Sequence, residues 1–175
     1  MQKYTFGLTA ILVGAVLPTG LMPSLATLKK IGEVNEGSAS MTMEKGESTK
    51  IYEEGNPTPK VVIPKPDSVS FEFALLDATP ELIKEYLGGV TEGATAVGFL
   101  GKTIQVEKAV LVKPDQGVYF AIPRASITAT IGGEFNSDGT LVMTMTVEPL
   151  DPGNDKSPIS TDYLTNLEAN LPPAG

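Results

Sequence analysis

Catalysis in this chain would have to use carboxylates, lysines, tyrosines and hydroxyl groups, because its 175 residues include no cysteine and no histidine. These two absences exclude a Ser-His-Asp triad, a Cys-His pair and a zinc site of cysteines and histidines. Glu53 and Glu54 are adjacent acids, but neighbouring side chains of an extended chain point to opposite sides. Because general acid–base groups must converge on one substrate atom, we interpret this pair as part of a solvated acidic loop.

Metal and phosphate sites have little support in the sequence. Asp151, Asn154 and Asp155 offer oxygen ligands, but they lack the spacing of a calcium loop and its bidentate glutamate. The same residue types favour ordinary turns. Gly132-Gly133 is not followed by the Lys-Ser/Thr pair of a phosphate-binding loop. We expect no catalytic residue, no metal and no cofactor, and therefore no enzyme.

Composition favours an all-β protein that does not bind nucleic acid tightly. The chain has 18 glycines and 14 prolines, which indicate many turns. It carries 21 acidic against 13 basic residues, a formal charge of −8, and its only arginine is Arg124. A nucleic-acid-binding surface needs a basic patch. An acidic chain can nevertheless lie beside DNA if its role is to repel it.

Alternation of apolar and polar residues with a period of two dominates the chain, as is typical of half-buried strands. It is clearest in four segments, residues 38–44, 68–76, 102–113 and 140–148. Within 102–113, Lys108 interrupts an otherwise apolar face. We predict a mainly all-β fold, a β-sandwich or barrel, with one flanking helix, an extended loop and terminal arms.

The alternation changes phase between residues 117 and 132. Apolar residues are even-numbered up to Ile122 and odd-numbered from Ile127. Because a slip of one residue turns every side chain to the other face, the pattern predicts a bulge or corner near Pro123-Arg124. The sequence Asn136-Ser137-Asp138-Gly139 then predicts a hairpin turn.

One helix is predicted at about residues 79–88. Thr79 is a suitable N-cap, Pro80 suits the first helical position and Gly88-Gly89 ends the segment. Its apolar stripe, which should pack on the sheet, consists of Leu82, Ile83, Tyr86 and Leu87. A weaker helical pattern, with leucines at 164, 167 and 171, covers residues 160–171.

The polar faces of the predicted strands carry small hydroxyls and carboxylates and no lysine or arginine. These residues are Ser38, Ser40, Thr42, Glu44, Ser70, Glu72, Thr128, Thr130, Thr144, Thr146 and Glu148. Serine and threonine are common on any exposed strand face. The alternative interpretation is a non-adhesive surface past which a polyanion slides.

The N-terminus contains an apolar run from Phe6 to Leu17 that is similar to a short signal peptide. Its charged n-region is weak, no clean small-x-small cleavage site follows Leu17, and the run is too short to span a bilayer. We expect an uncleaved segment. The predicted organisation is a single domain over 1–175, with an N-terminal arm 1–25, a long loop 45–66 and a C-terminal arm 150–175.

The long loop contains the stretch KIYEEGNPTPKVVIPKP, residues 50–66. Its prolines restrict the chain, so less entropy is lost when the segment orders on a partner. Its short apolar run has the character of a strand that could be added to another sheet. We therefore predict a subunit interface made by Tyr52, Glu53, Glu54, Asn56, Pro57, Pro59, Val61, Val62 and Ile63.

The order of these segments resembles that of bacteriophage tail tube proteins. AILVGAVLP leads into MPSLATLKKIGEVNEGSASMTM, and the long loop then precedes SVSFEFALLD and TPELIKEYLGG. Tail tube proteins are similar in fold to type VI secretion tube proteins. The resemblance covers nearly the whole chain and rests on element order rather than on one diagnostic motif.

The resemblance implies a virion protein whose β-sandwiches assemble into hexameric rings and a hollow tube. It also implies contacts through the long loop, DNA passing through the tube without specific binding, and partners among tape measure, sheath or terminator, and baseplate or tip proteins. Assembly would take place in the host cytoplasm, without a membrane. Two alternatives remain: an exported β-sandwich that binds a ligand or surface, and a hydrolase using two carboxylates.

Overall fold

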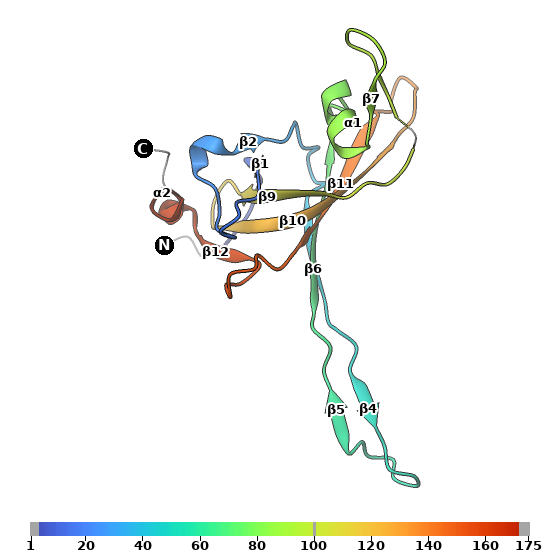
Figure 1. The fold of residues 1–175 in the computed structure, drawn as a ribbon, viewed down its shortest axis with the longest axis vertical. Coiled ribbons are helices and arrows are strands. Elements are labelled where there is room, and N and C mark those ends of the chain that lie inside the picture. The colour runs from blue at the N-terminus through green and yellow to red at the C-terminus, as the bar shows by residue number, and fades with distance from the viewer. Residues whose placement is uncertain (1–3, 100, 172–175) are drawn as a thin grey trace.

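The computed structural model describes residues 4–99 and 101–171 and confirms a mainly β fold (Figure 1). Its main sheet has the order β2-β1-β9-β10-β11-β6-β3, and β12 pairs with β10 beside this path; all pairings are antiparallel. The strands are β1 (Ala10–Gly14), β2 (Lys29–Lys30), β3 (Ser40–Glu44), β6 (Ser68–Leu75), β9 (Val106–Lys113), β10 (Val118–Gly132), β11 (Val142–Pro149) and β12 (Ser160–Tyr163).

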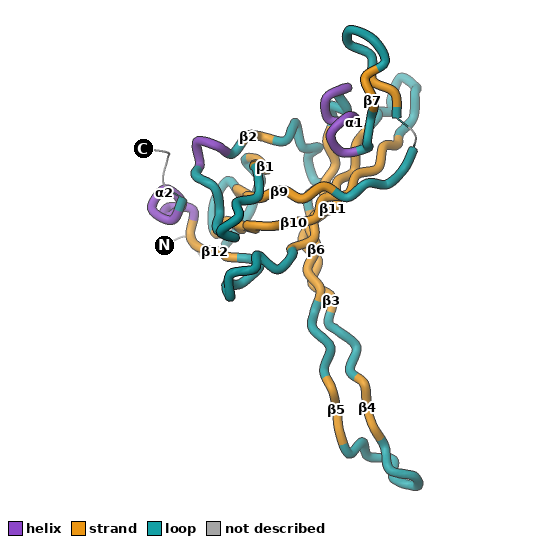
Figure 2. The backbone as a smooth tube through the Cα atoms, viewed as in Figure 1, coloured by secondary structure: helices purple, strands orange, loops and turns teal. Residues whose placement is uncertain are grey.

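Smaller elements are attached to this sheet (Figure 2). Two further pairs of strands stand apart from it, and two short α-helices and two 3-10 turns complete the chain. They are β4 (Thr49–Ile51) with β5 (Val61–Ile63), β7 (Val90–Thr91) with β8 (Val97–Gly98), α1 (Pro80–Tyr86), α2 (Leu167–Asn170), η1 (Leu25–Thr27) and η2 (Leu164–Asn166).

Strand β10 bends the sheet at the predicted phase change. Its pairing with β9 shifts between Ile122, opposite Val110, and Ala125, opposite Lys108. Two residues of β10 thus oppose one residue of β9, which is the arrangement of a β-bulge. The prediction of a bulge at Pro123-Arg124 is confirmed. Before the bulge β10 pairs with β12, and after it with β11, so the two halves of the strand belong to different parts of the sheet.

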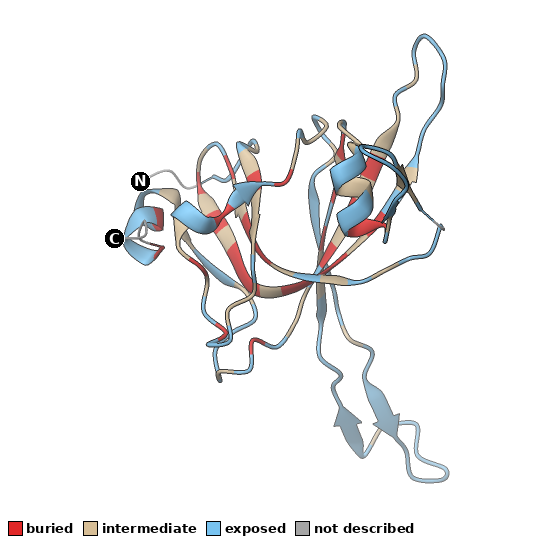
Figure 3. Ribbon diagram, turned by 45° about the horizontal axis from the view of Figure 1, so that its top comes forward, coloured by how far each residue is buried: buried red, intermediate tan, exposed pale blue. Residues whose placement is uncertain are grey.

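The core lies on the concave side of the bent sheet. Phe71 of β6 packs against Phe120 of β10, with ring centroids 5.7 Å apart, so the two parts of the sheet enclose one cluster. Members of this cluster with no exposed surface include Leu75, Val110, Ile122, Ile127, Met143, Met145 and Val147. A second cluster, around Leu111, Tyr119 and Leu167, covers the opposite face of the part that contains β12. That part is therefore covered on both faces, whereas the part containing β3, β6 and β11 is covered on one (Figure 3).

Helix α1 forms where it was predicted and packs on the core. The Thr79 hydroxyl accepts a hydrogen bond from the Leu82 amide at 3.4 Å, and Gly88 takes φ 70° after the last turn. Burial raises the pKa of the Tyr86 phenol well above its ordinary value. Lys108, which interrupted the apolar pattern of β9, forms an ion pair with Glu85 of the helix at 2.6 Å. The Lys108 ammonium group is thereby paired with a carboxylate of the helix instead of being buried alone.

The N-terminal segment is built into the sheet over residues 10–14, in contrast to the predicted arm. Strand β1 lies between β2 and β9, with Ile11 almost fully buried. The same apolar run that is similar to a signal peptide therefore supplies a strand. In the part of the chain that the structure describes, no helix has both the length and the apolar character to cross a membrane.

The C-terminal segment also differs from its prediction. Residues 160–163, predicted to begin a helix, form β12 on the edge of β10, and helical turns begin only at Leu164. Asp162 fixes the turns that follow, because its carboxylate accepts hydrogen bonds from the side-chain amides of Asn166 and Asn170. These bonds, foremost that from Asn170, lower the pKa of Asp162. The strand edge of β10 therefore takes the first four residues of the predicted helical segment, whereas its leucines lie in the helical turns that follow.

Candidate functional site

The polar faces predicted from separate strands lie together on one open face of the sheet. Ser40 pairs with Glu72, Glu72 with Thr146, and Thr146 with Thr128, which makes a continuous row across β3, β6, β11 and β10. We call this surface the polar face. Its members are Ser40, Thr42, Glu44, Ser70, Glu72, Thr128, Thr130, Thr144, Thr146 and Glu148.

The polar face is the reverse side of the core. Side chains alternate along each strand, so Phe73, Met145 and Ile127 point inward from the same strands and are no more than 2% exposed. The members of the polar face are exposed or half-buried, and none of them is basic. The face therefore offers hydroxyls and carboxylates to solvent over four adjacent strands.

Ser38 is placed differently from the other predicted members. It precedes β3, and its hydroxyl oxygen accepts a hydrogen bond from the Ala74 amide at 3.1 Å. The hydroxyl itself lies 2.7 Å from the Asn35 carbonyl oxygen, to which it donates. Ser38 thus fastens the chain to the end of β6 rather than extending the polar face. The sequence could not reveal this, because the alternation continues unbroken through residue 38.

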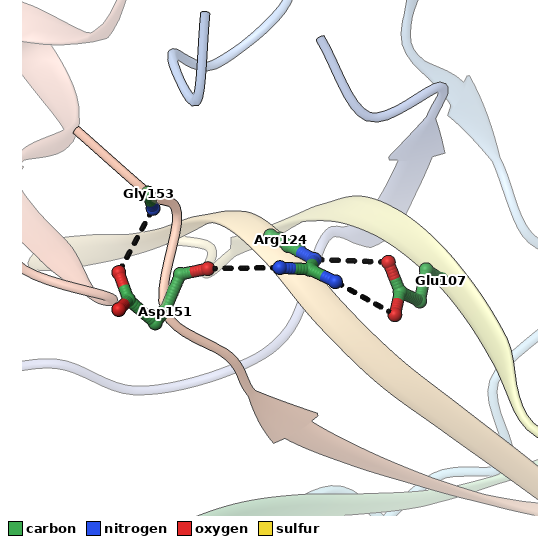
Figure 4. Close-up of polar contacts among 4 residues, drawn as sticks. All are labelled: Glu107, Arg124, Asp151 and Gly153. Atoms are coloured by element: carbon green, nitrogen blue, oxygen red, sulfur yellow. Dashed lines mark hydrogen bonds and ion pairs between the residues drawn. The ribbon is translucent and has the colours of Figure 1, made fainter. Parts of the chain in front are cut away.

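Arg124 marks the end of the polar face at the bulge. Its guanidinium donates to both carboxylate oxygens of Glu107, at 2.9 and 3.0 Å, and to the Asp151 carbonyl at 3.3 Å (Figure 4). The Asp151 carboxylate accepts from the Gly153 amide at 2.8 Å, which closes the turn. Asp151 therefore serves a turn, and no cluster of three acids able to hold a metal occurs among the residues described.

Because Arg124 donates hydrogen bonds to Glu107 and adds a positive charge beside it, the pKa of that carboxyl is below its ordinary value. We predict that Arg124→Gln raises the pKa of Glu107 towards that of a free glutamate. A carboxyl-carbon NMR titration measures this directly. Asp162 is the internal control, because its lowered pKa depends on Asn170 and should not move. An unchanged midpoint for Glu107 would contradict this account of the pair.

The predicted long loop is a β-hairpin arm that projects from the sheet (Figures 1 and 2). We call residues 45–66 the arm. The arm continues the register of the β3–β6 hairpin. Counting nine residues forward from Ser40 and nine residues back from Glu72 leads from the pair Ser40↔Glu72 to the pair Thr49↔Ile63, which is the observed pairing of β4 with β5. The arm is thus the same hairpin as β3–β6. The ladder is interrupted beside Pro64 and Pro66, which have no N–H to donate.

The register divides the arm into two unlike faces. Ile51, Val61 and Ile63 share one face with Thr49, whereas Lys50 and Val62 share the other. We call the first the apolar face of the arm. Its three large side chains are each about half exposed, at 49–50%. A two-stranded hairpin is marginally stable alone in water, so this face is typical of a segment that is buried against a partner.

The tip of the arm is held by local contacts within the chain. Lys60 forms an ion pair with Glu53 at 2.7 Å, and the Asn56 side chain accepts from the Thr58 amide at 3.0 Å. The adjacent residues Glu53 and Glu54 are both exposed. Among the described residues, they are not part of any group of three acids that could hold a metal ion. The other predicted interface residues, Tyr52, Pro57 and Pro59, lie between β4 and β5 on the same tip. Sequence reasoning located the arm but missed its internal pairing.

A groove of about 650 Å³ opens between the N-terminal segment and the β3–β6 hairpin. Phe71, Phe73 and Phe120 contribute to its apolar lining, and Glu36 and Asp115 add negative charge. Met41 also lines it and is 49% exposed, because β3 is an edge strand. No signal in the sequence pointed to this groove, since its walls come from segments far apart in the chain.

Comparison with known proteins adds no family assignment: no family model matches the sequence, and neither does any curated protein.

Proposed function

We propose that the chain is a structural subunit of a bacteriophage tail tube, which assembles with copies of itself into rings and a hollow conduit for DNA. The observation that carries the proposal is the polar face, a surface without basic residues that extends over four strands. Lined by such surfaces, a channel would repel phosphates and release no counterions, so DNA would be confined without being bound.

The edges of the same part of the sheet support ring formation. The outer edge of β3 has no strand partner within residues 4–99 and 101–171. In that same part of the chain, the outer edge of Val106–Lys108 is also free, because β1 pairs only with Ala109–Lys113. Exposed edges are sites where chains add to one another. Joining the β3 edge of one copy to the β9 edge of the next is a head-to-tail contact, and repetition around an axis closes a ring.

The alternative of an exported binding protein has less support. Cleavage near Leu17 would remove β1, which pairs with β9 over five residues and with β2 over two. The hydrolase alternative would need two convergent acids in a pocket. Glu53 and Glu54 lie on the exposed tip of the arm instead. A structural rather than enzymatic role, in a phage tail and with other tail proteins as partners, is part of the proposal.

Electron microscopy of concentrated, purified protein tests this proposal. We expect rings or tubes built from regularly repeated copies of the subunit, either from the pure protein or after tail assembly factors are added. Sedimentation velocity at the same concentrations gives the assembled fraction. Protein that remains strictly monomeric in both measurements, with assembly factors present, would contradict the proposed function.

A further inference from the structure

We propose that the groove between the N-terminal segment and the β3–β6 hairpin is the receptor for the apolar face of the arm of a second copy. This inference rests on the proposed function, since it requires self-assembly, and it adds which two surfaces meet. The occupant is thus defined as Ile51, Val61 and Ile63 of another copy, rather than a small molecule or an unrelated protein.

The chemistry of the groove suits an apolar occupant. Its volume of about 650 Å³ lies in the range of sites that enclose a ligand. Phe71, Phe73 and Phe120 belong to or pack on the main core, so the groove gives access to the end of the core itself. Exposed Met41 would also lose solvent contact when the groove is filled. Flexible methionine side chains adapt to the shape of an incoming partner.

The shape of the arm suits insertion into a groove. Three large aliphatic side chains lie on one face of a narrow ribbon, and Lys50 lies on the other. Such a ribbon can bury its apolar face in a groove while Lys50, on the other face, stays at the solvent-exposed rim of that groove. Because the backbone is already paired and prolines restrict the adjoining segments, little conformational entropy is lost on binding.

A chain cannot fill its own groove with its own arm. Ala39, which lines the groove, and Ile51 lie on the same side of one hairpin. At the rise of an extended strand, the segment between them spans roughly 40 Å. Bending the arm back would break the ladder at the base of the hairpin, where Asp67 accepts from the Gly46 amide at 2.9 Å. An arm in the groove therefore comes from another copy.

Charge is complementary between the two surfaces. The acids Glu36 and Asp115 line the groove. The arm brings Lys50 and Lys65, and neither forms an ion pair within the described residues. Lys30, which also lines the groove, is paired with Glu33 at 2.8 Å. Opposite charges of this kind steer association and fix its register.

The contact has a consequence for assembly. An arm in one copy and a groove in the next are two different surfaces, so the contact is heterologous, and between stacked rings it repeats along the axis as an open series. A ring built through sheet edges leaves the arms free to bind the grooves of an adjacent ring. The arm–groove contact would thus set the growth of a tube along its axis.

Disulfide crosslinking tests the contact cleanly, because the chain has no native cysteine. One variant carries Ala39→Cys in the groove, and its partner carries Val61→Cys on the apolar face of the arm. Val62→Cys is the matched control, since Val62 is as exposed as Val61 but lies on the other face. One variant of each pair carries a size tag, so that a non-reducing gel separates the mixed disulfide from disulfides between like chains.

After assembly and oxidation, we expect several-fold more mixed disulfide from Val61→Cys than from Val62→Cys, because a disulfide needs close and correctly directed Cβ atoms. Charge reversal by Lys50→Glu with Lys65→Glu should also lower that yield, whereas Lys156→Glu in the C-terminal loop should not. Tubes with equal or reversed crosslinking yields would overturn this contact alone. Absence of both assembly and crosslinks would overturn the proposed function, and this inference with it.

Discussion

Replacing residues 48–64 with Asn-Gly is expected to leave a folded monomer that no longer assembles into tubes. The last pair of the β3–β6 ladder is Glu44↔Ser68, and continuing the same register by three residues places Glu47 opposite Lys65. A two-residue Asn-Gly turn between them closes this hairpin without a slip. The shorter deletion of residues 53–60 removes only the tip and should weaken assembly in the same direction.

The fold should survive this replacement because the arm contributes no residue to either core cluster. Its large apolar side chains are about half exposed in the single chain, and β5 pairs only with β4. We therefore expect a melting temperature close to that of the intact protein. The intermolecular contact, in contrast, loses its whole apolar face, and buried aliphatic side chains each contribute about 1.5–3 kcal/mol.

Thermal denaturation, light scattering and electron microscopy, applied to the same samples, separate the two effects. A core variant, Phe73→Ala, is the matched control for loss of fold, because its side chain is 2% exposed. It should lower the free energy of unfolding by about 3–5 kcal/mol. Normal tubes from the armless variant would show that the arm is not an assembly element. A large loss of stability would show that it belongs to the fold.

The sequence could predict what depends on local pattern. Period-two alternation located β3, β6, β9, β10 and β11, and the phase change located the bulge. The alternation also predicted which residues make up the polar face, because side chains at every second position of a strand point to the same side. That these strands are neighbours, so that Ser40, Glu72 and Thr146 form one row, depends on pairings between distant segments. Those pairings leave no mark on local pattern.

Where sequence reasoning was wrong or incomplete, a tertiary partner decided the outcome. Ser160–Tyr163 became a strand because β10 offered an edge before its bulge. Ala10–Gly14 became a strand between β2 and β9, within the apolar run that is similar to a short signal peptide. In the arm, prolines indicated a loop, yet the register of β3–β6 passes through them and resumes at Thr49↔Ile63. Pro64 and Pro66 interrupt the hydrogen bonds without ending the hairpin.

The polar face yields the second prediction of large effect, a charge reversal at Glu72. This residue lies in the row from Ser40 to Thr128 and has no basic neighbour in it. Glu72→Lys replaces one negative charge with one positive charge in every subunit of a ring. If the polar face lines the channel, each lysine would neutralise a phosphate and release counterions. DNA would then bind where it otherwise slides.

Two measurements report this change. Phage carrying Glu72→Lys should eject DNA more slowly, and Glu44→Lys should act in the same direction. Purified Glu72→Lys tubes should bind DNA with an affinity that falls steeply with salt, by about one unit of log–log slope per phosphate contact. Glu72→Gln removes the negative charge without adding a cation, so it should fall between the parent protein and Glu72→Lys.

Glu81→Lys is the matched control because it changes the net charge equally on the opposite side of the sheet. Glu81 lies in the first turn of α1, which packs on the core face rather than on the polar face. Charge reversal at Glu81 should lower the free energy of unfolding by no more than about 1 kcal/mol, through the helix dipole. It should leave the rate of DNA ejection unchanged. If Glu72→Lys and Glu81→Lys slowed ejection equally, the effect would follow net charge rather than position. If neither did, the polar face would lie away from the DNA path, and the conduit would have to be lined by another surface.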